Sequence, residues 1–144
     1  MNQPIEHITH EGKLVALIIL SSFRKDGIEF FTANEFSQQL AYMNRPAGYR
    51  IEPHVHNPVQ RQVLHTLEVL FIRSGKVAID FYSDQQEFIG QRVLGAGDVI
   101  LLVSGGHGFK MLEPTEMIEV KQGPYSGDQD KTRFNGIEEK GNRP

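Results

Sequence analysis

The sequence contains no cysteine, which excludes a disulfide bond and a thiolate metal site. It also contains no apolar run long enough to cross a bilayer, since the longest, Leu14 to Leu20, is far shorter than a membrane-spanning helix. The residues flanking that run make a poor signal peptide. The formal net charge of -3 gives no support for binding to nucleic acid or to an acidic membrane. These absences predict a soluble, cytoplasmic protein with no nucleic-acid or membrane partner.

The chain is long enough for one domain with a substantial core. It has 144 residues, and its apolar fraction of 39% is ordinary for a globular protein. Short apolar or alternating segments are separated by turn residues, a pattern typical of an all-β barrel or sandwich. The first two predicted strands are joined by a short loop ending in Asp26-Gly27, which predicts a hairpin. The predicted strands are 14–20, 28–32, 38–44, 49–56, 68–72, 76–82, 88–94, 99–103 and 116–121.

The two ends of the chain are expected to lie outside this domain. Residues 1–12 are polar and predict an N-terminal arm, whereas residues 13–122 contain the predicted strands. Residues 123–144 are glycine-rich and polar, so we expect this C-terminal extension to wrap the surface or to fray. The sequence therefore predicts a single β domain with short additions at both ends.

One stretch, Gly48 to Gly75, combines residues that suit a metal ion. Side chains two residues apart on a strand leave the same face, so His54 and His56 would point into one space. Glu68 would share a face with apolar residues of the strand that it begins, and a buried carboxylate needs a partner. Two imidazoles and a divalent ion would supply that partner. His65, three residues before Glu68, would face the opposite way and is expected at the surface or at an interface.

Together with a second stretch, these residues resemble the two sequence motifs of the cupin superfamily. The first motif resembles the glycine, the His-x-His, the glutamate and the second glycine found here. The second resembles a Gly-Asp pair followed by a pair of glycines and a histidine. The matching residues are Gly48, His54, His56, Glu68, Gly75, Gly97, Asp98, Gly105, Gly106 and His107. The resemblance runs from Gly48 to about Met111, and the loop between the His-x-His and Glu68 is longer than the family norm.

The resemblance implies a single-domain antiparallel β-barrel of the cupin type, also described as a double-stranded β-helix or jelly roll. It further implies that His54, His56, Glu68 and His107 hold one divalent metal ion, usually iron, manganese, nickel or zinc. A homodimer is implied as well. The chain is similar to small cupins found among enzymes of sugar and surface-polysaccharide biosynthesis. The alternative interpretation is a barrel that keeps the fold without the metal.

Glu119 and Lys121 are the candidate catalytic residues outside this ligand set. On the predicted strand 116–121 they share a face, opposite Ile118 and Val120. Alternation favours the apolar pair inside and the charged pair in water. The opposite arrangement would bring Glu119 and Lys121 to the site as an acid–base pair for proton transfer.

These residues and the resemblance together imply a metal-dependent enzyme that acts on a small oxygen-rich molecule, and the resemblance alone implies a sugar or a sugar-derived acid. A bound ion would polarise a carbonyl or hydroxyl of the substrate for isomerisation or epimerisation, and with iron the same ligands would support oxidation by dioxygen. The alternative function is a metal-bearing module that binds a small ligand without turnover. A general acid or base beside the ion would distinguish the enzyme from the binding module.

Overall fold

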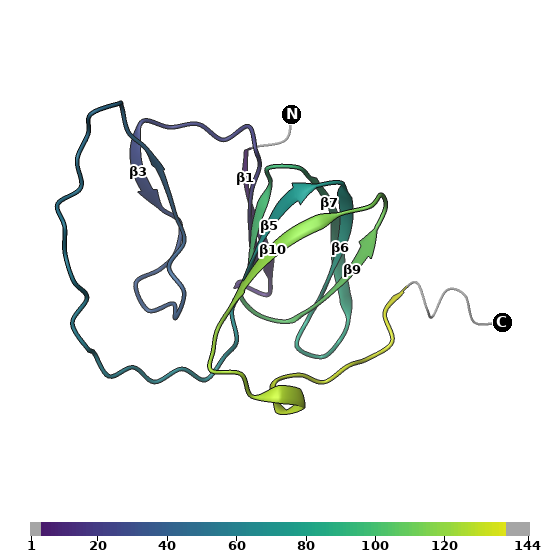
Figure 1. Ribbon diagram of the computed structural model, residues 1–144. Helices are drawn as coiled ribbons and strands as arrows, with labels where there is room; N and C mark the ends of the chain where they lie inside the picture. The colour runs from purple at the N-terminus through teal and green to yellow at the C-terminus, as the bar shows by residue number, and fades with distance from the viewer. Residues whose placement is uncertain (1–3, 138–144) are drawn as a thin grey trace. The chain divides into compact units, whose positions relative to one another are not determined.

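The computed structural model describes residues 4–137 of the chain (Figure 1). Residues 1–3 of the expected arm and residues 138–144 of the expected extension lie outside the described part. By its internal contacts the chain divides into two compact units, a larger one formed by Met1–Phe23 and Thr66–Pro144 and a smaller one formed by Arg24–His65.

The larger unit is built from two antiparallel sheets. In the first sheet the strand order is β1 (Ile5–His10), β2 (Lys13–Ile19), β8 (Val99–Leu102), β5 (Glu68–Ser74) and β10 (Glu116–Lys121). In the second sheet the order is β7 (Phe88–Gly95), β6 (Lys76–Tyr82) and β9 (Gly106–Met111). The all-β prediction is therefore confirmed. The strands that the structure describes do not close into the barrel that the resemblance implies.

The two sheets pack face to face over one apolar cluster. The predicted alternation on β6 is confirmed, since Val77, Ile79 and Phe81 share a face and are each 0% exposed. On β5, Leu70 and Ile72 are buried in the same cluster. The other sheet strands add Ile8, Val15, Ala16, Ile18, Leu94, Ile100 and Leu102. Because the cluster draws side chains from both sheets, it fixes the inner face of each strand, including those that carry the candidate site.

The N-terminal quarter of the chain pairs differently from the prediction. Residues 5–10, expected in a polar arm, form strand β1 and pair with β2. The predicted hairpin between 14–20 and 28–32 is wrong, because β2 pairs with β1 and β8. The physical reason is that residues 15–19 of β2 are all buried, which is the environment of a central strand that needs a neighbour on each side.

The smaller unit contains one hairpin, formed by β3 (Gly27–Phe30) and β4 (Ala41–Asn44). The strand predicted over residues 49–56 is not formed, since the described chain has no regular secondary structure from residue 45 to residue 67. Proline lacks a backbone donor and disfavours a sheet interior. Pro46, Pro53 and Pro58 interrupt this stretch, which accounts for the difference.

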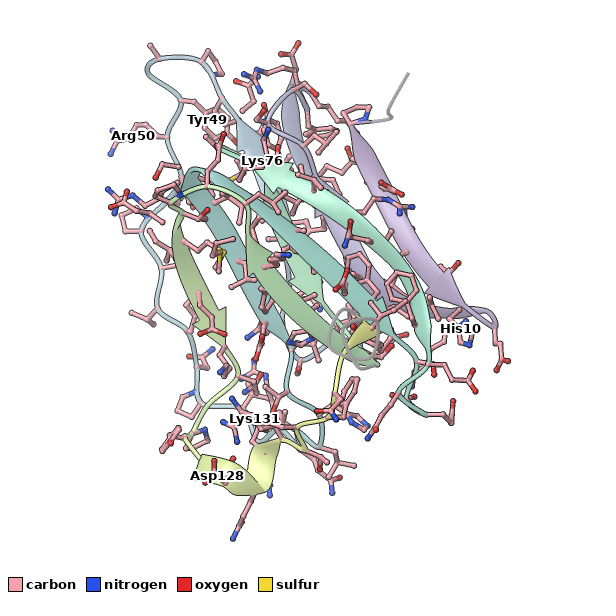
Figure 2. The ribbon with its side chains drawn as sticks, turned by 90° about the vertical axis from the view of Figure 1, so that its right-hand side faces the viewer. His10, Tyr49, Arg50, Lys76, Asp128 and Lys131 are labelled. Carbon is pink, nitrogen blue, oxygen red and sulfur yellow. The ribbon has the colours of Figure 1, made fainter. Side chains whose placement is uncertain are left out.

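After β10 the chain makes a short 3-10 turn, η1 (Gly127–Asp130), and continues to residue 137. Figure 2 shows Asp128 on this turn and Lys131 just after it. Over residues 4–137, no helix has the length and apolar character needed to span a membrane.

Candidate functional site

Glu68 and His107 meet between the two sheets of the larger unit. Glu68 begins β5, and His107 lies near the start of β9, where it pairs with Phe81 of β6. The distance between Glu68 Oε2 and His107 Nε2 is 3.4 Å. The Glu68 side chain is only 13% exposed and that of His107 is 29% exposed. Two of the four predicted metal ligands thus lie side by side and largely shielded from solvent, although they come from different sheets.

A glycine bend delivers His107 to this position. Gly105 has a φ of +71°, in the left-handed region that side chains other than glycine rarely adopt. A Cβ atom at Gly105 would also lie 2.3 Å from the carbonyl oxygen of Tyr82, so the chain passes too close to β6 for any other residue. The sequence Ser-Gly-Gly before His107 therefore has a structural cause: it lets β9 start directly against the end of β6.

Strand β10 brings a third and a fourth ionisable side chain to the face that carries Glu68. The register pairs Lys121 with Glu68 and Glu119 with Leu70, and residues opposite each other in antiparallel strands lie on the same face. Lys121 Nζ lies 3.4 Å from Glu68 Oε1 and 3.5 Å from Glu119 Oε1. The four side chains therefore form a chain of contacts that runs from His107 to Glu68, from Glu68 to Lys121 and from Lys121 to Glu119.

The expectation that the apolar side chains of strand 116–121 face inwards is wrong. Ile118 and Val120 are 47% and 57% exposed, whereas Lys121 and Glu119 share the face of Glu68. The physical reason is the register with β5, because Lys121 opposite Glu68 forms an ion pair on the inner face. A cross-strand pairing of this kind leaves no trace in the alternation of β10 alone.

Hydrogen bonding and charge keep Glu68 ionised. The hydrogen bond from His107 is the largest influence and lowers the pKa of Glu68, while partial burial opposes it and the charge of Lys121 assists it. In turn, the negative charge of Glu68 raises the pKa of Lys121. At neutral pH the pair is thus a carboxylate beside an ammonium group, and Lys121 is a proton donor rather than a base.

The lowered pKa of Glu68 predicts an acid-sensitive contribution to stability. A carboxylate with a native pKa below its ordinary value of 4.5 stabilises the folded state fully above that value. The contribution is lost as the pH falls below 4.5 and through the native pKa. We expect the free energy of unfolding of the metal-free protein to fall more steeply below this pH in the wild type than in Glu68→Gln, as measured by urea unfolding. Parallel curves for the two proteins would contradict the prediction.

The other two predicted ligands belong to the smaller unit. The rings of His54 and His56 lie edge to face with centroids 5.2 Å apart, and both residues are exposed. His54 Nδ1 lies 2.9 Å from the carbonyl oxygen of Glu52. Because a carbonyl can only accept, Nδ1 carries the proton, which leaves the lone pair of Nε2 for a metal. His65 is exposed, in agreement with its prediction as a surface residue.

The structure therefore brings the four predicted ligands together as two pairs, one pair in each unit. Within the described residues, no three His, Asp or Glu side chains form a group that could hold a metal ion. Sequence reasoning named all the charged residues of the Glu68 cluster. It missed that Lys121 contacts Glu68 directly, which depends on strand register.

Comparison with known proteins adds no relative to this description. No protein-family model matches the chain, and no curated protein and no solved structure is significantly similar to it. The function is therefore argued from the geometry and chemistry of the residues themselves.

Proposed function

We propose that this chain is a metal-binding protein of the cupin type, in which His54, His56, Glu68 and His107 hold one divalent ion. The Glu68–His107 pair is the observation that carries the proposal. Two ligands bound to one ion at about 2.1 Å each have donor atoms about 3.0–3.4 Å apart, and the Glu68 and His107 donors are 3.4 Å apart. Imidazole nitrogen and carboxylate oxygen are also the donors that first-row divalent ions accept. The residues present thus fit the ion.

The His54–His56 pair supports the same proposal from the other half of the ligand set. Both rings are exposed and adjacent, so both are accessible to an ion. The contact of His54 with the Glu52 carbonyl is the type of support that orients metal-binding histidines and fixes their tautomer. We propose that these two imidazoles are metal ligands.

We propose further that the site catalyses isomerisation or epimerisation of a sugar or a sugar-derived acid. A bound ion would polarise a carbonyl or hydroxyl oxygen of such a substrate. In isomerisation, Glu119 would accept the proton from the carbon next to that carbonyl and return it to the former carbonyl carbon, while the hydroxyl proton passes to the former carbonyl oxygen. In epimerisation, Glu119 would accept the same proton and pass it to solvent, and water would supply a proton to the opposite face of that carbon. Lys121, which is held as an ammonium group by Glu68, donates a hydrogen bond to the oxygen on which negative charge develops.

The acid–base pair favours this reaction over the two alternatives. A carboxylate and an ammonium group 3.5 Å apart beside the proposed ion can move a proton and stabilise developing negative charge, neither of which a module that only binds a ligand requires. Oxidation by dioxygen on iron does not require a proton carrier of this kind either. Glu119 and Lys121 are the general acid and base that separate an enzyme from a binding module.

Metal content tests the proposal most directly. We expect the purified wild type to contain nearly one divalent ion per chain by elemental analysis, and His54→Ala purified in parallel to lose it. His65→Ala is the matched control, since it removes an exposed histidine from the same irregular stretch outside the ligand set and should keep the ion. A wild type that stays empty after reloading with iron, manganese, nickel or zinc would refute the proposal.

A further inference from the structure

The described part of the C-terminal segment, residues 122–137, returns to the body of the larger unit. Its first step is the backbone N–H of Gln122, which donates to the carbonyl of Leu67, 3.0 Å away. The chain then makes the turn η1, on which Figure 2 shows Asp128, and passes Lys131. Residues 122–137, which we call the strap, therefore leave the five-stranded sheet next to Leu67, the residue that precedes Glu68.

Three contacts anchor the strap beyond that point. The hydroxyl of Thr66 donates to a carboxylate oxygen of Asp130. The ring of Phe134 packs edge to face on Tyr82, with centroids 5.0 Å apart. The backbone N–H of Ile137 donates to the Tyr82 hydroxyl, 3.1 Å away. Tyr82 points away from the core cluster and yet is only 4% exposed, so the strap and Phe88 cover it.

These anchors lie at the end of the larger unit that carries the candidate site. Glu68 begins β5 and pairs with Lys121 at the end of β10. In the other sheet, Gly106 begins β9 and pairs with Tyr82 at the end of β6. The Glu68–His107 contact joins these two strand ends across the sheets. The strap thus starts beside Lys121 and ends on Tyr82 and Gly106, which places both of its ends next to charged residues of the site.

We propose that Phe134 is a positioning residue that holds His107 in line with Glu68. A Cβ atom at Gly106 would lie 3.0 Å from Phe134 Cζ, so the ring rests against the backbone of the residue just before His107. Gly105 holds that backbone against the carbonyl of Tyr82. The same Cβ position at Gly106 lies 3.4 Å from Tyr82 Cβ, so Phe134 packs over the place where β9 meets the end of β6. Without the ring this packing is lost, and His107 can turn away from Glu68.

The role of His107 as a ligand rests on the proposed function, whereas the docking of the strap does not. The test therefore has two independent readouts on the full chain. The first is trypsin cleavage of the metal-free protein after Lys131 and Arg133 in the strap, followed by mass spectrometry with cleavage after Arg61 as the internal reference. The second is the affinity for Mn²⁺ or Zn²⁺ alone, measured by calorimetry. Phe134→Leu tests whether a smaller apolar side chain restores the resistance to cleavage and the ion affinity that Phe134→Ala loses.

We expect Phe134→Ala to raise strap cleavage about ten-fold relative to cleavage after Arg61, because docking of the strap limits opening. We expect it to lower ion affinity about ten-fold, as residues that orient metal ligands do. Tyr125→Ala, which removes an aromatic ring that is 95% exposed from the same segment, should change neither. Unchanged cleavage would refute the docked strap, and faster cleavage with unchanged ion affinity would refute the positioning of His107. A wild type that binds no ion would refute the proposed function. The cleavage result would then still show whether the strap is docked through Phe134.

Discussion

Replacing Glu68 with Gln should lower the affinity of the chain for a divalent ion by more than about 100-fold, since partners that merely orient a ligand already contribute about 10–100-fold. The substitution keeps the size of the side chain and removes its negative charge, so the lost term is the attraction between the carboxylate and the cation. Because the side chain is only 13% exposed, water replaces that attraction poorly. Titration with Mn²⁺ and Zn²⁺ against a competing chelator measures the change.

Lys121→Met is a control in which the affinity for a divalent ion should change in the opposite direction. The ammonium group of Lys121 already occupies a cation position 3.4 Å from Glu68 Oε1. A divalent ion that binds Glu68 must compete with Lys121 for the carboxylate, and the positive charge of Lys121 repels the ion. Removing the ammonium should therefore tighten ion binding, while the apolar stem of methionine preserves the packing. Weaker binding in Lys121→Met would show that Lys121 supports the site rather than competing for Glu68, and equal loss in both variants would point to a general loss of fold.

The sequence predicts the fold best where one face of a strand carries the large apolar residues. Val77, Ile79 and Phe81 alternate with Ala78, Asp80 and Tyr82, and only the first three belong to the core cluster, because alternate residues of a strand lie on opposite faces. Pairing between strands is a different matter. The sequence predicts that the strand starting near Leu14 pairs with its neighbour in sequence. Its uniform burial needs two partners, and one of them, β8, lies more than 80 residues further along the chain. Local patterns contain no information about such distant partners.

In the candidate site too, features that depend on one strand alone can be predicted from the sequence, whereas features that depend on strand pairing cannot. Glu68 at the head of an apolar strand was recognisable because a charged residue on a buried face stands out against its neighbours. The inward direction of Lys121 was not, since the apolar Ile118 and Val120 of the same strand suggested the opposite face. Only the register with β5, which depends on the whole sheet, places the ammonium beside the carboxylate. The geometry of His54 was missed for a related reason: prolines replace its predicted strand by an irregular stretch.

Gly105→Ala should lower the free energy of unfolding by about 2–4 kcal/mol, because a left-handed backbone costs about 1–2 kcal/mol and the forced contact adds strain of similar size. The φ of +71° disfavours alanine, and the new Cβ would meet the carbonyl oxygen of Tyr82 at 2.3 Å, a backbone atom that cannot rotate away. Urea unfolding measures the loss.

Gly108→Ala is the matched control on the same strand, since nothing lies within 4 Å of its Cβ position and its φ is not in the left-handed region. We expect it to change stability by less than about 0.5 kcal/mol. If both variants unfold at the same urea concentration, the bend before His107 is not the constraint that the geometry indicates. If Gly105→Ala alone is destabilised, relief of its clash must move β9 away from β6. That movement takes His107 with it, so ion affinity should fall in the same variant that loses stability.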